Sequence, residues 1–236
     1  MSKQFYQAFA DKYDQIFPLK EQTLQFLDTV FHPANTVLDI GCATGMYANH
    51  LAHKNRHVLG IDLSDTMIDH AHKQKTNAFV RYQVRDMTTL HEQAHYDGLY
   101  SIGNTVVHLD GLDAVQAFIR QCYKALKPKG KMVIQLLNYD RIIDQNIHAL
   151  PMIKTPHLSF KRTYRFIGDH VRFETSITSN QKTVSQSTLL YPIRYGPLLK
   201  ALKDARFKKI EAYDGFTDKP YDINESYALV IVAHAS

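Results

Sequence analysis

Cysteine is scarce in this chain: there are two among 236 residues, which excludes a disulfide-based scaffold. No Cys-x-x-Cys pair and no cluster of Cys and His indicates zinc, and we expect no metal. No run of about 18 apolar residues predicts a membrane span, and the first residues contain no apolar signal core. We therefore expect a reduced, cytoplasmic, soluble protein.

The chain also lacks internal repeats and low-complexity segments. Its composition is 44% hydrophobic and 22% charged, which is ordinary for a folded globular protein and argues against disorder. The length suits one large α/β domain, or one such domain that carries a sizeable insertion.

Short apolar runs alternate with amphipathic helical stretches between residues 36 and 138. The runs predict buried parallel strands over 36–40, 57–62, 79–84, 98–102 and 131–137. The best amphipathic helix covers 113–126, and the same pattern resumes with a helix near 196–205 and strands at 209–213 and 227–232. This alternation predicts a Rossmann-like, doubly wound, mostly parallel sheet of seven strands in the α/β class.

A different period interrupts the α/β pattern after residue 150. Apolar and polar residues alternate there, which predicts three antiparallel strands with one covered face. We expect a helical N-terminal segment over 1–33, an α/β domain over 34–150 and 194–236, and an antiparallel β insertion over 151–193.

A glycine-rich turn follows the first strand, in Asp39-Ile40-Gly41-Cys42-Ala43-Thr44-Gly45. Ligands bind beyond the carboxyl ends of parallel strands, and glycine lets the backbone approach them closely. Asp62 ends the second strand, where a carboxylate can accept hydrogen bonds from a ribose diol. The dinucleotide fingerprint fails, because Ala43 and Met46 occupy two of its glycine positions, so a nicotinamide cofactor is disfavoured.

The segments 37–45 and 60–67 resemble motifs I and II of class I S-adenosylmethionine-dependent methyltransferases. The resemblance covers about residues 36–138 and the closing helix and strands. Ala43 departs from the pattern, since the family more often has glycine there. The resemblance implies S-adenosylmethionine as the cofactor and S-adenosylhomocysteine as its product.

Within this resemblance, the glycine turn faces the methionine part of the cofactor and Asp62 holds the ribose. Leu63 and Met67 pack on the adenine, and Asp86 and the Met87 amide bind its edge. Tyr6 and Tyr13 belong to a lid helix, or only to ordinary helix packing. The implied cofactor residues are Tyr6, Tyr13, Asp39, Gly41, Cys42, Thr44, Gly45, Asp62, Leu63, Met67, Asp86, Met87, Ser101 and Gly103.

The segment 101–109 and Asn138-Tyr139-Asp140 resemble the small-molecule branch, which includes glycine and sarcosine N-methyltransferases. Glycine itself is not expected as the substrate, because Leu137 replaces an arginine that grips the substrate carboxylate in that branch. Asn104, His108 and Tyr139 are the candidate catalytic and positioning residues. His108 either orients the substrate and accepts a proton or makes a structural hydrogen bond.

These features predict direct in-line methyl transfer to nitrogen or oxygen of a small molecule, by a monomer or homodimer that binds no membrane. Base methylation is disfavoured, since the chain lacks an Asn/Asp-Pro-Pro-Tyr/Phe run and a Pro-Cys pair. Two alternatives stay open: an RNA methyltransferase that uses a basic insertion, and a cofactor-binding protein without catalysis.

The net charge of +5 is concentrated in the insertion. Residues 151–195 contain seven Lys or Arg and two Asp or Glu, whereas the remainder has 21 of each sign. This imbalance favours an anionic small molecule over RNA as the partner. Arg162 shares the apolar face of the first inserted strand, so it either faces an anionic group on the substrate or reaches a sheet edge or Glu174.

Overall fold

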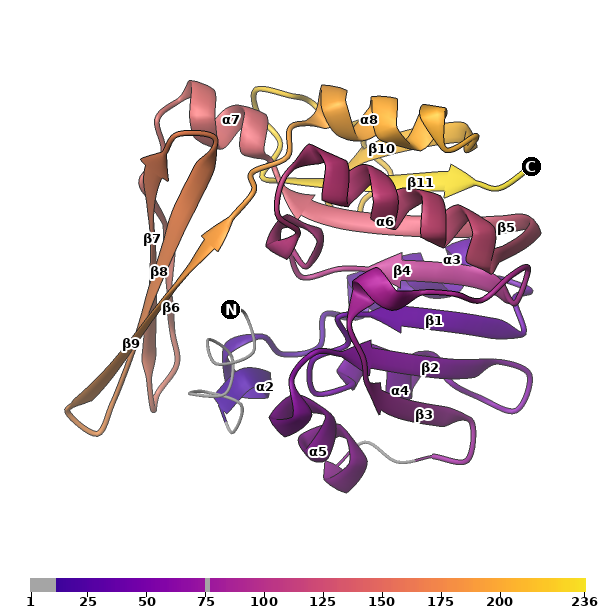
Figure 1. Cartoon of the computed structure of the whole chain (residues 1–236). Helices are drawn as coiled ribbons and strands as arrows, with labels where there is room; N and C mark the ends of the chain where they lie inside the picture. The colour runs from indigo at the N-terminus through magenta and orange to yellow at the C-terminus, as the bar shows by residue number, and fades with distance from the viewer. Residues whose placement is uncertain (1–11, 75–76) are drawn as a thin grey trace.

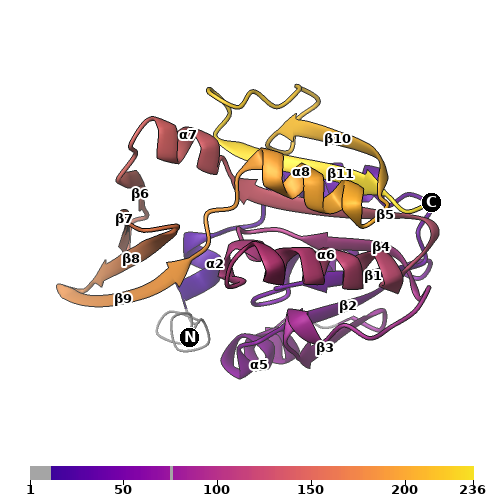
Figure 2. The same ribbon diagram turned by 45° about the horizontal axis from the view of Figure 1, so that its top comes forward.

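The computed structural model describes residues 12–74 and 77–236. It contains a seven-stranded sheet with helices on both faces, and a separate four-stranded sheet (Figure 1). The four-stranded sheet stands opposite the carboxyl ends of the parallel strands in both ribbon views (Figures 1 and 2). No helix in the described ranges is long and apolar enough to cross a membrane.

The large sheet confirms the predicted α/β class. Its order is β10-β11-β5-β4-β1-β2-β3, with parallel pairing from β5 to β3 and antiparallel pairing of β11 with β5 and β10. The strands are β1 Thr36–Ile40, β2 His57–Asp62, β3 Val80–Val84, β4 Tyr96–Ser101, β5 Leu126–Leu137, β10 Lys208–Asp214 and β11 Ala228–His234. The strand order reverses beside β1, and a ligand crevice is expected at such a switch point.

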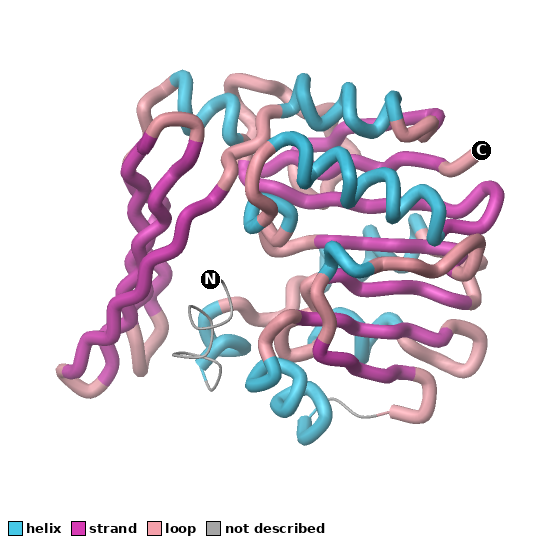
Figure 3. Tube along the Cα trace, in the orientation of Figure 1, coloured by secondary structure: helices cyan, strands magenta, loops and turns pink. Residues whose placement is uncertain are grey.

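Helices cover the large sheet on two sides, as the tube trace shows (Figure 3). Buried side chains of α6 and α8 join one core cluster, and those of α3, α4 and α5 join another. The helices and 3₁₀ turns are α2 Tyr13–Ile16, α3 Glu21–Val30, α4 Met46–Leu51, α5 Asp65–Gln74, η2 Met87–Thr89, η3 Val106–His108, α6 Leu112–Ala125, α7 Tyr139–Asp144 and α8 Tyr195–Asp204.

The inserted sheet has four strands, one more than the alternation predicts. Its antiparallel order is β6-β7-β8-β9, and the strands are β6 Ala149–Lys154, β7 Ser159–Ile167, β8 His170–Ser179 and β9 Lys182–Leu190. The extra strand is β6, an edge strand that contains Pro151 and buries only Leu150 fully. Proline is tolerated at edges, and one buried side chain leaves no period-two pattern to detect.

Polar contacts hold together the two segments of the chain that flank the insertion. Arg194, just before α8, forms a two-pronged ion pair with Asp144 of α7, with N···O distances of 3.0 and 2.7 Å. The backbone amide of Tyr195 also donates to the buried Asp140 carboxylate at 2.8 Å. The lower part of the inserted sheet packs on α2 through a small cluster of Ile16, Leu158, Phe160 and Ile177.

Candidate functional site

A cavity of about 690 Å³ lies at the carboxyl ends of β1 to β4. Nine of the residues predicted for function line it: Tyr13, Gly41, Asp62, Leu63, Met67, Asp86, Met87, Gly103 and His108. Segments far apart in the sequence therefore meet at one place, as the strand-end argument predicts.

The turn after β1 brings the backbone to the cavity wall. Gly41 has a φ of +78°, and a Cβ at this position would collide with the side chain of Thr105. The amides of Gly41 and Cys42 both donate to the Ile61 carbonyl, at 2.8 and 3.0 Å. Only glycine fits this conformation and this close approach without strain.

Asp62 presents an oriented carboxylate at the end of β2. Its Oδ2 accepts a hydrogen bond from the Ala43 amide and its Oδ1 accepts one from the Ser64 amide, each at 2.9 Å. Burial raises the pKa of Asp62, and the bonds from Ser64 and Ala43 oppose that rise. Each oxygen can accept a further hydrogen bond, so the pair suits two neighbouring hydroxyls.

The segment after β3 forms another wall of the cavity. Asp86 caps η2, and its Oδ1 accepts from both the amide and the hydroxyl of Thr88 at 2.8 Å. Met87 lines the cavity directly after it. Across the cavity, Met67 is buried, whereas Leu63 is 39% exposed. Together these residues offer apolar surface and one carboxylate edge, which suits a planar heteroaromatic group.

Arg85 is a cavity residue that sequence reasoning missed. Its guanidinium donates to both oxygens of Glu92, at 2.5 and 2.8 Å. The same bond lowers the pKa of Glu92 to about 2. The one available signal was the position of Arg85 beside Asp86, because the pairing with Glu92 depends on the loop conformation.

Ala43, Ser64 and Thr105 also line the cavity without having been assigned a function. Ala43 has a φ of +49°, which a residue with a side chain rarely adopts. The glycine more usual at this point in the motif was the available signal for it. Nothing in the sequence indicates that Thr105 packs against Gly41.

Asp39 and Cys42 lie behind the cavity wall and do not line it. Asp39 is 2% exposed and accepts a hydrogen bond from the Tyr100 hydroxyl at 2.8 Å. Burial raises the pKa of Asp39 to about 8, against the effect of that hydrogen bond. The Cys42 side chain packs over Gly60, where an added Cβ would lie 2.9 Å from its Sγ. Burial also raises the pKa of the Cys42 thiol.

Thr44, Gly45 and Ser101 support the turn from outside the cavity. The Thr44 hydroxyl donates to Asp14 of α2, which joins the helix to the turn. Gly45 precedes α4 with a φ of +75°, and the ring of Tyr82 occupies the space that a Cβ would need. The Ser101 hydroxyl donates to the Ile40 carbonyl at 3.0 Å. Tyr6 lies outside the described residues.

Asn104 and Tyr139 form a hydrogen-bonded pair beside the cavity. The Asn104 Nδ2 donates to the Tyr139 hydroxyl at 2.8 Å, and its Oδ1 accepts from the Leu137 amide at 3.1 Å. Asn104 has a φ of +68° and directly follows the cavity residue Gly103. Burial raises the pKa of Tyr139 to about 12, so its phenol stays protonated at neutral pH. The pair joins the ends of β4 and β5.

His108 reaches the cavity from η3. Burial lowers its pKa to about 4, so its imidazole is neutral at pH 7. A neutral imidazole can accept a hydrogen bond, but it is too weak a base to deprotonate an ammonium group. Among residues 12–74 and 77–236, no three His, Cys, Asp or Glu side chains gather into a metal-binding group.

The sequence is similar to those of known methyltransferases. Residues 37–130 match the family described as "Methyltransferase domain". The glycine/sarcosine N-methyltransferase of Aphanothece halophytica is 23% identical over 233 residues, covering 91% of this chain and 84% of the relative. A ubiquinone biosynthesis O-methyltransferase of Coxiella burnetii (strain RSA 493 / Nine Mile phase I) is 31% identical over 106 residues, 43% of each chain.

The fold has a close match among solved structures. An S-adenosylmethionine-dependent methyltransferase from Clostridium acetobutylicum ATCC 824 superposes with a TM-score of 0.83 at 16% identity, covering 98% of this chain and 99% of that one. At this identity the likeness concerns the fold.

The cavity suits S-adenosylmethionine, the cofactor named in the description of the Clostridium structure. Gly41 lets the turn pack directly against the side chain of Thr105 at the cavity wall, and the half-buried, amide-oriented Asp62 can accept from a ribose diol. Met67 and Leu63 offer apolar surface to an adenine ring. The fold, the family match over residues 37–130 and this donor set agree: the chain contains a methyltransferase domain and is similar to the class I S-adenosylmethionine-dependent methyltransferases.

Proposed function

We propose that the protein moves a methyl group from S-adenosylmethionine to nitrogen or oxygen of a small molecule by direct in-line transfer. The observation that carries the proposal is the amide-oriented Asp62 carboxylate at the wall of a cavity of about 690 Å³. The Aphanothece relative is named for N-methylation and the Coxiella relative for O-methylation, and both names refer to small-molecule acceptors.

S-adenosylmethionine, when bound, supplies a methyl group already activated on a sulfonium, so the protein needs little acid or base power. Asp62 binds the ribose hydroxyls, and Asp86 with the Met87 amide binds the adenine edge. Leu63 and Met67 flank the adenine, while the backbone at Gly41 and Gly103 approaches the methionine part. These contacts fix the position of the reacting carbon, which is a proximity effect.

The acceptor side is formed by Asn104, Tyr139 and His108. The hydrogen bond between Asn104 and Tyr139 holds both side chains beside Gly103, so they position the acceptor. His108 is neutral at pH 7 and accepts a hydrogen bond from the nucleophile. An amine acceptor must arrive in its neutral form, because none of the three residues is a strong base.

The inserted sheet and α2 cover the side of the cavity at which methyl transfer takes place. The inserted sheet faces the strand ends (Figure 2), and α2 packs against its lower part. Tyr13 lines the cavity and its ring centroid lies 5.0 Å from that of Phe17, which contacts Phe160 of the inserted sheet. Such a cover excludes water from the transfer and limits the size of the acceptor.

Transfer of radiolabelled methyl from S-adenosylmethionine to a metabolite extract and to total RNA tests the proposal. We expect label in the small-molecule fraction, and loss of that label in the Asp62→Asn variant. Label confined to RNA would instead favour an RNA methyltransferase whose basic insertion binds the nucleic acid. Cofactor binding without transfer to either fraction would contradict catalysis.

A further inference from the structure

On the inner face of the inserted sheet, the cationic side chain of Arg162 lies among apolar neighbours. Leu158, directly before β7, and Phe160 and Tyr164 within it are at most 5% exposed, whereas Lys161 and Arg165 on the other face of the strand are exposed. Arg162 shares their face, because successive side chains of a strand point to opposite sides. In the sheet register, Arg162 lies opposite Leu150 of β6 and Thr175 of β8, which are also buried.

The guanidinium of Arg162 has unused hydrogen-bonding capacity. Its Nη2 donates to the Pro151 carbonyl at 2.8 Å, and its Cζ lies 5.6 Å from the centre of the Phe160 ring. Its Nε is buried and has no hydrogen-bond partner in the described part of the chain. Within that part, no carboxylate lies within 4.0 Å of Arg162, and Glu174 instead approaches Arg165. Leaving a buried charged donor unpaired is costly unless a ligand completes it.

Tyr164, two residues along the same face, repeats the pattern. Its side chain is 4% exposed, and its buried hydroxyl interacts with that of Tyr139 but makes no hydrogen bond of ordinary geometry among residues 12–74 and 77–236. Burial raises the pKa of this phenol, and the nearby charge of Arg162 opposes the rise. Two buried polar atoms, the Nε of Arg162 and the hydroxyl oxygen of Tyr164, thus lie near each other without a well-formed hydrogen bond. Buried polar groups are nearly always paired, so the arrangement indicates a missing anion.

Two series of side-chain contacts lead from Arg162 and Tyr164 toward the cofactor cavity. The ring of Tyr164 lies 6.4 Å from that of Tyr139, whose hydroxyl is bonded to Asn104 beside the cavity. On the other side, Arg162 lies over Phe160, which contacts Phe17 directly after α2, and α2 supplies the cavity residue Tyr13. Neither residue lines the cofactor cavity itself, but Tyr164 neighbours the pair of Asn104 and Tyr139 to which the proposed function assigns the acceptor.

We propose that Arg162 and Tyr164 bind an anionic group, a carboxylate or a phosphate, on the acceptor molecule. This inference rests on the proposed function and specifies its substrate class. The excess of positive charge in residues 151–195 agrees with it, since the rest of the chain is balanced. A planar guanidinium matches the oxygens of either group, and Tyr164 supplies a further donor.

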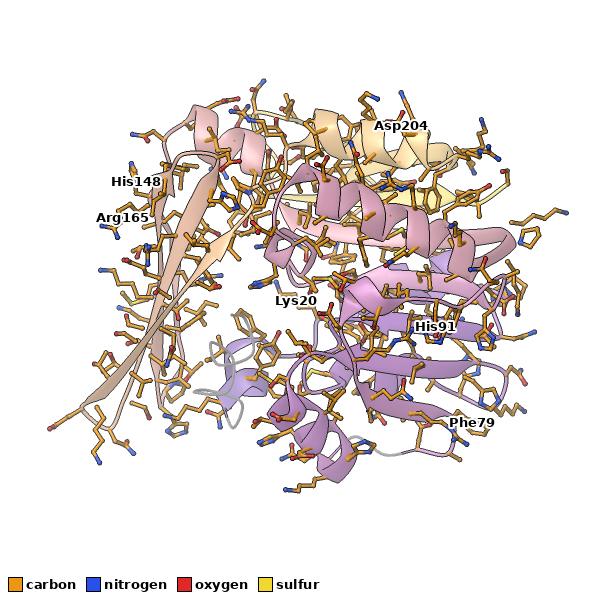
Figure 4. The ribbon with its side chains drawn as sticks, in the orientation of Figure 1. Lys20, Phe79, His91, His148, Arg165 and Asp204 are labelled. Atoms are coloured by element: carbon orange, nitrogen blue, oxygen red, sulfur yellow. The ribbon has the colours of Figure 1, made fainter. Side chains whose placement is uncertain are left out.

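Variants on the two faces of β7 test this site. Arg162→Ala removes the charge, Arg162→Lys keeps it, and Tyr164→Phe removes only the hydroxyl. Arg165→Ala is the matched control, because Arg165 lies on the same strand and points away from the large domain (Figure 4). Methyl transfer to the metabolite extract, the affinity for S-adenosylhomocysteine and the thermal unfolding midpoint are measured for each.

We expect Arg162→Ala to raise the KM for the acceptor about 10- to 100-fold, as the loss of a charge-assisted contact implies. The KM for the acceptor should rise less in Tyr164→Phe and less in Arg162→Lys than in Arg162→Ala. In Arg165→Ala it should equal the wild-type value. Cofactor affinity should stay unchanged in all four. An unchanged KM in a folded Arg162→Ala variant overturns the proposal, as does a loss of cofactor affinity that accompanies the loss of activity.

Chemical treatment of the labelled product identifies the anionic group. Amidation with a carbodiimide and an amine shifts the mass of a product that carries a carboxylate. Phosphatase treatment shifts the mass of a product that carries a phosphate monoester. Either shift supports the proposal, and a labelled product with neither group overturns it. Absence of any labelled small molecule would instead refute the proposed function, so the two failures are distinguishable.

Discussion

The backbone amide of Ala43 donates a hydrogen bond of 2.9 Å to the Oδ2 of Asp62, 19 residues further along the chain. The bond joins the turn after β1 to the end of β2. A second amide, from Ser64, holds the other carboxylate oxygen. The carboxylate is therefore oriented before any ligand arrives, and ligand binding need not bear the entropy cost of ordering it.

The Asp62→Asn variant should bind S-adenosylhomocysteine about 10- to 100-fold more weakly. Asparagine places an NH₂ group opposite one of the two amide donors and removes one acceptor from the ribose, so charge-assisted bonds are lost. Equilibrium dialysis measures the affinity. Asp69→Asn is the control, because Asp69 is exposed on the adjacent helix α5. An affinity within twofold of the wild type would contradict the assigned role.

Ala43→Gly should stabilise the protein by about 1 kcal/mol, because glycine adopts a positive φ without the steric cost that alanine bears. Gly41→Ala should act in the opposite direction and destabilise it by more than about 2 kcal/mol, since its Cβ meets Thr105 at a φ of +78°. Urea unfolding of both variants checks the contrast. Stabilisation by Gly41→Ala would show that the turn is described wrongly.

Asp39 should make stability fall as pH rises from about 4 to about 8. Its pKa is raised from 3.8 to about 8, so the folded protein holds a proton that the unfolded chain releases over this range. Asp39→Asn removes this effect while keeping an acceptor for Tyr100. Its stability relative to the wild type should rise between pH 5 and pH 8 by a few kcal/mol, as the size of the shift implies. Urea unfolding at several pH values measures it, and a constant difference would contradict it.

Tyr139→Phe should lower the rate of methyl transfer about tenfold and leave the affinity for S-adenosylhomocysteine unchanged. The substitution removes one of the two partners of the Asn104 side chain, which is then held beside the cavity only by the Leu137 amide and is less well positioned. Tyr123→Phe serves as the control, since the Tyr123 hydroxyl bonds to Ser236 at the C-terminus. Weaker cofactor binding in Tyr139→Phe would place Tyr139 on the cofactor side instead.

The sequence predicts the large sheet well because its strands are apolar runs separated by amphipathic helices. It misses β6, whose only fully buried residue is Leu150 and which therefore carries no period. In the site, Asp62 is predictable from its place at a strand end. The ion pair of Arg85 with Glu92 and the packing of Thr105 on Gly41 are not, because they depend on loop conformation and on contacts between distant segments.

Calorimetric titration with S-adenosylhomocysteine tests most directly whether the cavity at the ends of β1 to β4 is the cofactor site. We predict one binding site per chain, and no measurable binding of NAD under the same conditions, because Ala43 and Met46 break the dinucleotide pattern. Absence of S-adenosylhomocysteine binding, or binding of NAD in its place, would contradict the account.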